Sequence, residues 1–393
     1  AELFCSNSLG SFGMGNASGL IKAEMRKLGS LILQAADFAQ VPAGGALAVD
    51  RDRFAAFVTE KIGQHPRITL HREEHHALSE DEPTIIATGP LTSEALSAEL
   101  RQRTGAEHLH FYDAAAPIVT LESLNMDKIF RQARYDKGEG EYLNCPFTKE
   151  EYEAFWKALT TAEGAVLHLG EEEKNFFEGC LPAEVIARRG IDTLRYGPMK
   201  PVGLTDPRTG RRPYAVLQLR QDNVAGDLYN MVGFQTQLKW GEQKRVFQMI
   251  PGMENAEFVR LGVMHRNTYL ASPAFLNASL QWREYPNWFL AGQLIGVEGY
   301  TESTAAGLMA GINLARVIRG QAPLVLPRTT MLGSLLHYVS HAEVKHFQPM
   351  NSNWGIIEPW PEKIRDKVKR HEMQAERALA DLEATMTSEL APV

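Results

Sequence analysis

Three cysteines are the residues of this 393-residue chain best suited to covalent chemistry. Cys5 lies in the polar segment CSNS, Cys180 lies upstream of the arginine pair 188–189, and Cys145 lies in LNCP. Cations near a thiol lower its pKa and make the thiolate available as a nucleophile. The alternative for each is a small, buried apolar side chain. No two cysteines form a CxxC pair, so the sequence predicts neither a disulfide framework nor a zinc site.

A second group able to do chemistry lies in the segment GVMHRNTYL, residues 262–270. His265, Arg266 and Asn267 place a titratable ring, a permanent cation and an amide at consecutive positions. Such a group can stack on a flat ring and hydrogen-bond its edge at the same time. A surface ion-pair feature is the alternative interpretation. The chain contains no HExxH motif and no paired carboxylates, so metal catalysis has no support.

Glycines in the segment GVEGY, residues 296–300, separate a predicted strand from a predicted helix. They permit a tight turn and a close approach to the backbone. The helix, which begins near Thr301, would direct its free N–H groups at an anion or an electron-rich cofactor edge. Tight packing of a helix on a sheet is the alternative. Thr88-Gly89 ends another predicted strand, and ligands of open α/β sheets bind outside such strand ends, so the two together indicate a large cofactor.

Basic residues concentrate in one stretch, although the net charge of the chain is −7. A nucleic-acid-binding protein is usually basic over its contact face, but a local patch suffices because screening limits the reach of distant charges. Residues 188–212 form a candidate RNA face, with a solvated loop as the alternative. The pair Lys239-Trp240 offers a cation beside an aromatic ring, a combination that also suits RNA.

The elements that position these groups follow from apolar periodicity and from Gly and Pro breaks. We expect helices over 18–38 and 50–62, a strand over 67–71, a strand over 84–90 followed by a helix from Ser93, irregular structure over 134–164, antiparallel strands over 212–238, a strand at 288–292 leading into a helix that runs through Arg316, and a charged helical tail over 361–386. The strand–turn–helix order indicates a parallel sheet.

The α/β pattern is interrupted after roughly residue 115 and resumes near 286. We therefore expect a nucleotide-binding domain over 1–115 and 286–393 and an inserted domain over 116–285, and a chain of this length suits two domains. No apolar run reaches about 18 residues and no secretory signal is present, so we expect a cytoplasmic protein with free thiols and no membrane span.

Several segments together resemble one family, the folate- and FAD-dependent tRNA (uracil-5-)-methyltransferases called TrmFO. The resemblance extends along essentially the whole chain and is carried by CSNSL at 5–9, VPAGG at 41–45, ATGPLTS at 87–93, NCP at 144–146, GPMKPVGL at 197–204 and the segment 262–270. Residues 291–307 are shared more loosely with the GidA/MnmG tRNA wobble-uridine enzymes. The segments at 5–9 and 262–270 favour TrmFO over that family.

The resemblance implies an α/β fold: a GidA-like FAD domain of the two-dinucleotide-binding type, interrupted by an inserted α+β domain. It implies that methylenetetrahydrofolate supplies the carbon, that reduced FAD supplies the hydride and that NADH or NADPH reduces the flavin. The product is 5-methyluridine in the T-loop of tRNA, and no protein partner is implied. The family opens with a Gly-rich FAD fingerprint, so we expect a further N-terminal piece before Ala1.

The chemistry requires a thiolate, because uracil C5 is a poor nucleophile until a thiolate adds at C6. The target base must also leave its stack to reach a buried flavin. The expected site residues are Cys5 and Cys180 for catalysis; Asn7, Thr88, Gly89, Gly296, Glu298, Gly299 and Tyr300 for FAD; His265, Arg266 and Asn267 for folate; and Arg188, Arg189, Lys200, Arg208, Lys239 and Arg245 for RNA. The alternatives are wobble-uridine modification of the GidA/MnmG type, a flavin/folate oxidoreductase without an RNA substrate, and a non-catalytic RNA-binding remnant.

Overall fold

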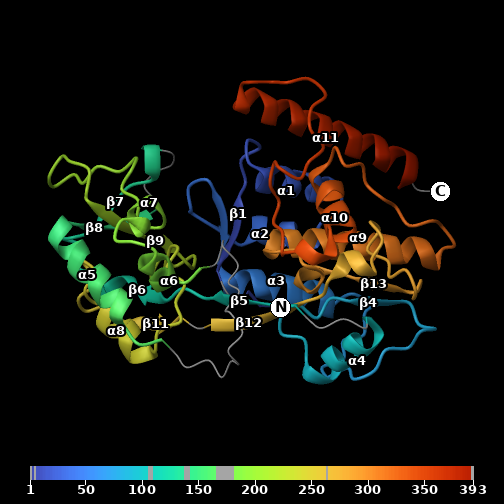
Figure 1. The fold of residues 1–393 in the computed structure, drawn as a ribbon, viewed down its shortest axis with the longest axis horizontal. Coiled ribbons are helices and arrows are strands. Elements are labelled where there is room, and N and C mark those ends of the chain that lie inside the picture. The colour runs from blue at the N-terminus through green and yellow to red at the C-terminus, as the bar shows by residue number, and fades with distance from the viewer. Residues whose placement is uncertain are drawn as a thin grey trace. The chain divides into compact units, whose positions relative to one another are not determined.

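Two compact units make up the part of the chain that the structure describes (Figure 1). The computed structural model describes residues 2–3, 6–104, 109–136, 142–164, 181–262 and 264–390, with the side chains of 109–114, 136 and 264–268 outside that description. Unit 1 comprises residues 1–8, 36–59 and 111–265, and unit 2 comprises residues 9–35, 60–110 and 266–393.

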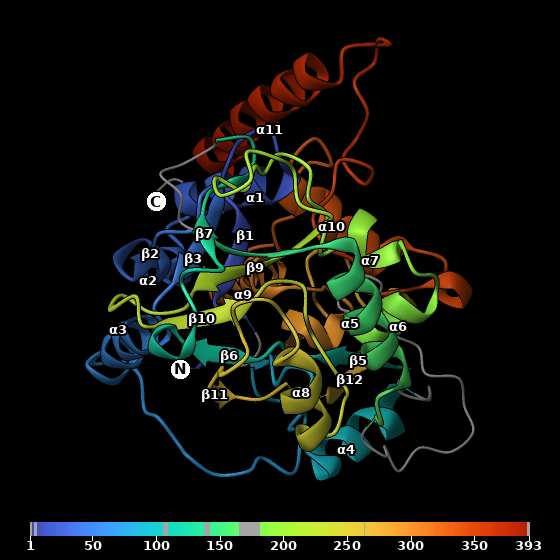
Figure 2. The ribbon, with the colours of Figure 1, turned by 90° about the vertical axis from the view of Figure 1, so that its left-hand side faces the viewer.

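A six-stranded antiparallel sheet forms the centre of unit 1 (Figure 2). Its strands lie in the order β11 (Phe258–Arg260), β6 (Ile118–Thr120), β10 (Leu228–Met231), β9 (Ala215–Gln221), β8 (Tyr142–Phe147) and β7 (Phe130–Arg131). Leu143 of β8 lies opposite Leu219 of β9, and Cys145 lies opposite Leu217. Because side chains alternate between the two faces, these residues share one face. They form the main core of the unit together with α5 (Lys149–Thr161), α6 (Ala183–Arg188) and α8 (Trp240–Phe247).

The opposite face of the same sheet is buried but polar. Asn144 lies opposite Gln218, and Asn230 lies opposite Arg220. All four side chains belong to buried residues. Gln218 Nε2 donates to Asn144 Oδ1 over 2.9 Å. Buried polar groups are hydrogen-bonded almost without exception, so this face requires partners from elsewhere in the unit.

The remaining elements of unit 1 are short. They are β2 (Gln40–Val41), β3 (Ala46–Val49), α7 (Thr193–Tyr196), η1 (Leu121–Ser123) and η2 (Arg134–Asp136), together with most of α3 (Arg51–Gly63). β2 pairs antiparallel with β3. Asp50 immediately precedes α3, and its Oδ1 accepts a bond from Arg53 N over 2.9 Å, as an N-cap does.

Unit 2 contains the parallel pair β4 (Thr84–Ile86) and β13 (Trp288–Leu290), which confirms the predicted parallel pairing. Its longer helices are α1 (Ala17–Lys27), α4 (Glu94–Thr104), α9 (Tyr300–Ile318), α10 (Met331–His341) and α11 (Lys367–Glu389), and its short 3₁₀ helices are η4 (Ser272–Ala274), η5 (Gly292–Ile295) and η6 (Val344–His346). Along α9, Ala305, Ala306, Met309 and Ala310 are fully buried. None of the described helices combines the length and apolar character needed to cross a bilayer.

Three expectations about local structure were wrong. Residues 18–38 form two helices, α1 and α2 (Leu31–Phe38), because Gly29 adopts a φ of 76° and ends the first. Residues 67–71 form no strand in the described chain, and all five residues are exposed. Residues 134–164 are more regular than their polarity indicated. β8 crosses the core, and α5 begins with a capping box between Thr148 and Glu151.

The chain passes between the units within two strands. β5 (Leu109–Ala114) begins in unit 2 and ends in unit 1, and β12 (Met264–Tyr269) begins in unit 1 and ends in unit 2. The first crossing, between residues 110 and 111, lies near the predicted boundary at residue 115, whereas the second, between residues 265 and 266, lies well before the predicted boundary at residue 285. Residues 36–59, which the sequence placed in the nucleotide-binding domain, group instead with unit 1. The assignment of a function to each domain stays a prediction.

A buried carboxyl group joins two helices of unit 2. Glu24 of α1 has no exposed surface, and its two oxygens accept bonds from Met331 N and Leu332 N, each over 2.8 Å. These N–H groups belong to the first turn of α10, where a helix has no internal partners for them. Burial raises the pKa of Glu24 to about 7, and the two backbone bonds oppose that rise.

We predict that Glu24→Gln flattens the pH dependence of unfolding between pH 5 and pH 7.5. The pKa of about 7 in the folded protein lies above the ordinary pKa of 4.5 for a glutamate, so the neutral carboxyl group is favoured on folding. The carboxyl group contributes its full stabilisation below pH 4.5 and loses it as the pH rises through 7. The free energy of unfolding should fall by roughly 3 kcal/mol over that range. Urea titrations at several pH values measure it. Glu372→Gln, at an exposed position of α11, is the control. An unchanged slope in Glu24→Gln would contradict the assignment.

Candidate active site

The residues predicted to perform catalysis and to bind folate fall largely outside the described part of the chain. Cys5 and Cys180 are outside the described residues. His265, Arg266 and Asn267 lie in β12, but their side chains are outside the description. Their roles therefore stay predictions.

Asn7, two residues after Cys5, is fully buried in unit 1. Its Nδ2 donates to Val49 O over 3.0 Å and to Gln221 O over 3.2 Å, so the side chain joins β3 to β9. Its Oδ1 accepts a bond from Arg220 Nη2 over 2.9 Å. Its carbonyl accepts a bond from Val49 N over 2.9 Å. Both amide hydrogens are used inside the unit, which leaves the side chain no donor for the FAD contact that the sequence predicted for it.

Arg220 supplies one of the partners that the polar face of the sheet requires. Its Nη2 donates to Ser6 Oγ over 3.0 Å as well as to Asn7. Ser6 Oγ also accepts a bond from Ser8 N over 3.0 Å. The guanidinium on β9 is thus bonded to both residues that follow Cys5.

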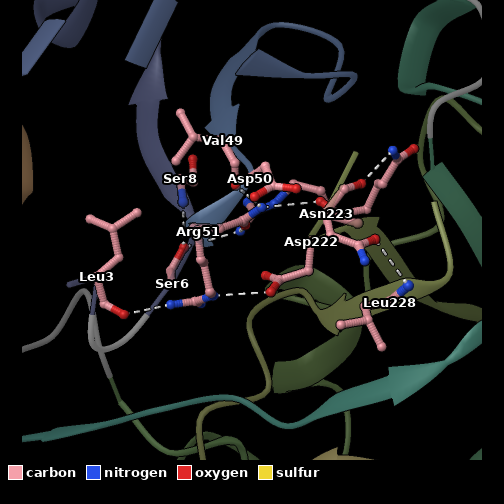
Figure 3. A network of polar contacts seen from close by, with 12 residues as sticks. Leu3, Ser6, Ser8, Val49, Asp50, Arg51, Asp222, Asn223 and Leu228 are labelled. Carbon is pink, nitrogen blue, oxygen red and sulfur yellow. Dashed lines mark hydrogen bonds and ion pairs between the residues drawn. The ribbon is translucent and has the colours of Figure 1, made fainter. Parts of the chain in front are cut away.

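A second arginine binds the chain before Cys5 (Figure 3). Arg51, the first residue of α3, donates from Nη1 to Leu3 O over 2.8 Å and from Nε to Asp222 Oδ2 over 3.0 Å. Asp222 is only 3% exposed, and burial raises the pKa of its carboxyl group while Arg51 opposes the rise. Asp50 Oδ2 accepts a bond from Val224 N over 2.9 Å and ties the start of α3 to the same loop.

The third cysteine is unsuited to catalysis. Cys145 is completely buried on the helix-facing side of β8, and burial raises the pKa of its thiol. A thiol in such surroundings stays protonated and inert. The structure therefore supports the apolar-core interpretation for this residue.

In unit 2, the predicted FAD residues follow two neighbouring strand ends. Leu290 of β13 lies opposite Ile86 of β4, and Ala291 N donates to Ile86 O, so both strands end at the same edge. Beyond β4, Thr92 Oγ1 donates to Gly89 O over 2.8 Å and lies 2.7 Å from Thr88 Oγ1. The loop after β4 is thereby closed into a turn with Gly89 at a φ of 75°.

The loop after β13 depends on two glycines. Gly296 has a φ of 81°, and a Cβ there would lie 2.4 Å from the ring of Phe347. Gly299 has a φ of 108°, and a Cβ there would lie 2.5 Å from Glu302 Oε2. Glu298 between them is buried and accepts a bond from Gln293 Nε2 over 2.6 Å. The two glycines therefore allow Phe347 and Glu302 to pack directly against the backbone just before the 19-residue helix α9.

Two charged residues near that loop were missed in the sequence. Glu302 lies in the first turn of α9 and accepts bonds from Ser352 N and Oγ. Lys22 of α1 is fully buried and donates to Ser11 O, Ser18 O and Ser18 Oγ. Burial lowers the pKa of Lys22 to about 8, and the Glu302 carboxylate opposes that change. The sequence signal that could have identified Lys22 is the presence of a lysine within the apolar run of α1.

The predicted RNA-binding cations differ in whether their charge is already paired with a carboxylate. Arg208 binds Asp206 through two bonds of 2.9 and 2.7 Å. Lys239 lies 2.6 Å from Glu163 and Arg245 lies 2.7 Å from Glu242. Arg188 Nε donates to Thr160 O over 3.2 Å, and the side chain of Lys200 is half-buried. Ion pairs with carboxylates thus offset the positive charge of three of the six predicted RNA-binding residues.

Two surface cavities lie along the basic stretch of unit 1. The first has a volume of about 510 Å³ and is lined by Arg189, Ile191 and Tyr196. Tyr196 is 83% exposed and was not among the residues predicted from the sequence. The second cavity has a volume of about 690 Å³, and its basic lining residues are Lys128, Arg208, Arg211 and Arg212.

Comparisons with known proteins identify close relatives. The family model described as "Glucose inhibited division protein A" matches residues 1–322. Proteins named "Methylenetetrahydrofolate--tRNA-(uracil-5-)-methyltransferase TrmFO" are similar along nearly the whole chain. The protein of Pelotomaculum thermopropionicum is 59% identical and the alignment covers 98% of this chain and 87% of the relative. The protein of Symbiobacterium thermophilum is 61% identical with the same coverage, and that of Enterococcus faecalis is 57% identical over 99% of this chain and 89% of the relative.

Solved structures support the fold. Aquifex aeolicus GidA in its form II crystal matches with a TM-score of 0.67 at 15% identity, over 99% of this chain and 68% of that chain. The form I crystal matches with a TM-score of 0.66 at 15% identity, over 99% of this chain and 71% of that chain. The predicted GidA-like α/β fold is confirmed.

We predict that Gly296→Ala destabilises the protein more than Gly292→Ala. Both glycines have a positive φ, of 81° and 74°, so both substitutions carry the left-handed backbone cost of about 1–2 kcal/mol. Only the Cβ at residue 296 meets the Phe347 ring, whereas a Cβ at 292 meets nothing within 4 Å. The additional overpacking cost is about 1–3 kcal/mol, measurable as a difference in the urea-derived free energy of unfolding. Equal losses would show that Phe347 moves freely aside.

Proposed function

This chain belongs to the TrmFO family, and we propose that it is a methylenetetrahydrofolate–tRNA-(uracil-5-)-methyltransferase. The observation that carries the proposal is 59% identity to a protein of that name over 98% of this chain. The substrate is tRNA, and the carbon donor is methylenetetrahydrofolate. We further propose that the modified base is the T-loop uridine and that the enzyme acts in the cytoplasm, where tRNA is the abundant substrate.

FAD is the cofactor of the GidA-type fold, and the residues beyond the two parallel strands of unit 2 suit it. A Cβ at Gly89 would meet nothing within 4 Å, which leaves room for a close approach to the backbone, and the N-terminus of α9 suits an electron-rich edge. Bound and reduced FAD supplies the hydride, and we propose that NADH or NADPH provides the reducing equivalents. The role of the chain is to orient the cofactor and exclude water.

The proposed covalent step belongs to the thiols. A cysteine thiolate adds to C6 of uracil, which makes C5 nucleophilic, and the C5 proton later leaves to a second group. We assign these roles to Cys5 and Cys180. The depth at which Cys145 is buried supports the assignment by elimination. We propose that His265 stacks on the pterin, with Arg266 or Asn267 at its polar edge.

We predict that methylenetetrahydrofolate labelled in its one-carbon unit transfers the label to tRNA, and that labelled S-adenosylmethionine does not. Cys5→Ala and Cys180→Ala should each abolish transfer, because addition to uracil requires a thiolate and the C5 proton must also be removed. The measurement is radioactivity in purified tRNA together with loss of the folate substrate.

Cys145→Ala is the matched control, because it removes a buried thiol whose pKa is raised by that burial. We expect full turnover and a loss of about 1 kcal/mol in stability. Transfer from S-adenosylmethionine would refute the folate mechanism. Folate consumption without label in tRNA would favour the oxidoreductase alternative, and label at the wobble position would favour the GidA/MnmG alternative.

We propose that RNA binds along the basic stretch of unit 1, centred on the cavity lined by Arg189 and Tyr196. An exposed aromatic ring beside a guanidinium offers stacking and charge together. Lys200 and Arg188 extend the face. Arg208, Lys239 and Arg245 contribute less, because their ion pairs with carboxylates reduce the net charge that a phosphate meets.

We predict that Tyr196→Ala weakens tRNA binding roughly 5- to 150-fold, the range expected for loss of one base–aromatic stack. Trp240→Ala is the control, since Trp240 is also exposed but lies beside the Lys239–Glu163 ion pair. We expect that variant to bind within about twofold of the parent. Filter binding at fixed salt measures both. A larger loss at Trp240 would move the proposed face to α8.

A further inference from the structure

The second cavity of unit 1 combines an apolar lining with an excess of cations. It has a volume of about 690 Å³, and its apolar lining includes Pro146, Pro213 and Pro251. Its charged lining residues are four cations and two carboxylates: Lys128, Arg208, Arg211, Arg212, Asp206 and Glu151. A concave surface of this size, with an apolar lining and a few charged groups, is typical of a ligand site. The excess of cations favours an anionic ligand.

Carboxylates already pair with two of the four cations. Arg208 donates from Nε and Nη2 to Asp206 over 2.9 and 2.7 Å, and from Nη1 to Asp127 O over 2.9 Å. Lys128 Nζ lies 2.7 Å from Glu254 Oε1. The charge of these two side chains is therefore largely offset, and they contribute less to the attraction of an anion than an unpaired cation does.

Arg211 and Arg212 are the cations of this cavity whose charge is not offset. Both are exposed, and neither guanidinium forms a hydrogen bond or an ion pair with the described residues. The loop that carries them is closed by hydrogen bonds. Asp206 N donates to Arg211 O over 3.0 Å, and Gly210 N donates to Asp206 O over 2.8 Å. Arg211 N donates to Thr209 Oγ1 over 3.2 Å. The backbone is thus ordered before a ligand arrives, which lowers the entropic cost of binding.

We propose that this cavity binds one nucleotide of the tRNA substrate, with its backbone phosphate held by Arg211 and Arg212 and its sugar and base packed against the prolines. The inference rests on the proposed tRNA methyltransferase function, and it assigns a phosphate site at the end of the basic stretch 188–212. A guanidinium matches a phosphate in bidentate geometry. A phosphate alone would fill only a small part of 690 Å³, whereas a nucleotide also uses the apolar lining.

The connection of this cavity to the proposed RNA face favours tRNA over a free nucleotide. Arg195, the residue before Tyr196, places its guanidinium 3.6 Å from the centroid of the Tyr214 ring. Its Nε donates to Tyr214 O over 3.0 Å. Tyr214 lines the second cavity, so direct contacts join the segment that carries the exposed Tyr196 ring to the wall of the phosphate site. One RNA strand can therefore offer a base to Tyr196 and a phosphate to the arginines.

We predict that the double variant Arg211→Gln/Arg212→Gln weakens tRNA binding about 10- to 100-fold, because charge-assisted bonds to a phosphate are lost. The slope of log Kd against log salt concentration should become shallower by about 1, as expected when one phosphate contact disappears. The KM for tRNA should rise while kcat stays unchanged, since the phosphate is held equally before and during the reaction. Filter binding at several salt concentrations and steady-state methylation measure these quantities.

Two variants serve as controls. Lys367→Gln/Lys369→Gln makes the same change in net charge at two exposed positions of α11 and should bind tRNA within about twofold of the parent. Arg211→Lys/Arg212→Lys keeps both charges but loses the fork geometry. It should keep the salt slope of the parent and recover part of the lost affinity.

The proposal is overturned if the Gln double variant keeps the affinity and the salt slope of the parent, or if the α11 variant loses as much. Calorimetry with uridine 5′-monophosphate distinguishes the source of the phosphate. Binding of this nucleotide at the two arginines, with tRNA affinity unaffected by the Gln substitutions, would overturn the assignment to tRNA. Failure of the proposed function gives a different result: the parent would transfer no labelled carbon to tRNA, while filter binding would still report on the two arginines.

Discussion

A buried guanidinium on a sheet face must find hydrogen-bond acceptors, and the arrangement of unit 1 follows from that need. Leaving Arg220 unbonded would cost several kcal/mol, since an uncompensated buried charge is among the most destabilising features a protein can contain. Its acceptors are Ser6 and Asn7, from the other end of the sequence. Asn7 in turn needs acceptors for its amide and finds them on β3 and β9. Satisfying one charge therefore fixes the path of the N-terminal segment.

The same requirement organises unit 2 at a different kind of site. The N–H groups that open α10 have no partners within the helix, and the buried carboxyl group of Glu24 accepts two of them. At the start of α9 the partner is local: Gly299 has a φ of 108°, and its missing Cβ leaves the space that the Glu302 carboxylate occupies. The carboxylate of the first turn therefore packs against the backbone of the N-cap residue of its own helix. The helix dipole favours a negative charge at that end.

The sequence predicted those parts of the fold that local pattern controls. The parallel strands β4 and β13 and the helix α9 follow from apolar runs and glycine breaks, and the segments shared with a known family identified the fold. The sequence did not reveal contacts between distant positions. Arg220 and Ser6 are 214 residues apart, and nothing in the pattern of β9 shows where a buried arginine finds its acceptors. Lys22 and Glu24 were equally hidden, because charged residues on an apolar helix face become intelligible only when their partners are known.

Charge pairing limits how this protein can hold an RNA. With a net charge of −7, long-range attraction for a polyanion is weak, and ion pairs with Asp206, Glu163 and Glu242 offset three of the selected cations. Binding that relied on phosphate contacts alone would be feeble at physiological salt. Stacking on exposed rings such as Tyr196 loses little strength as salt increases, and it requires bases that are already unstacked. An acidic enzyme that modifies tRNA is therefore better served by aromatic contacts beside a few cations than by a broad basic surface.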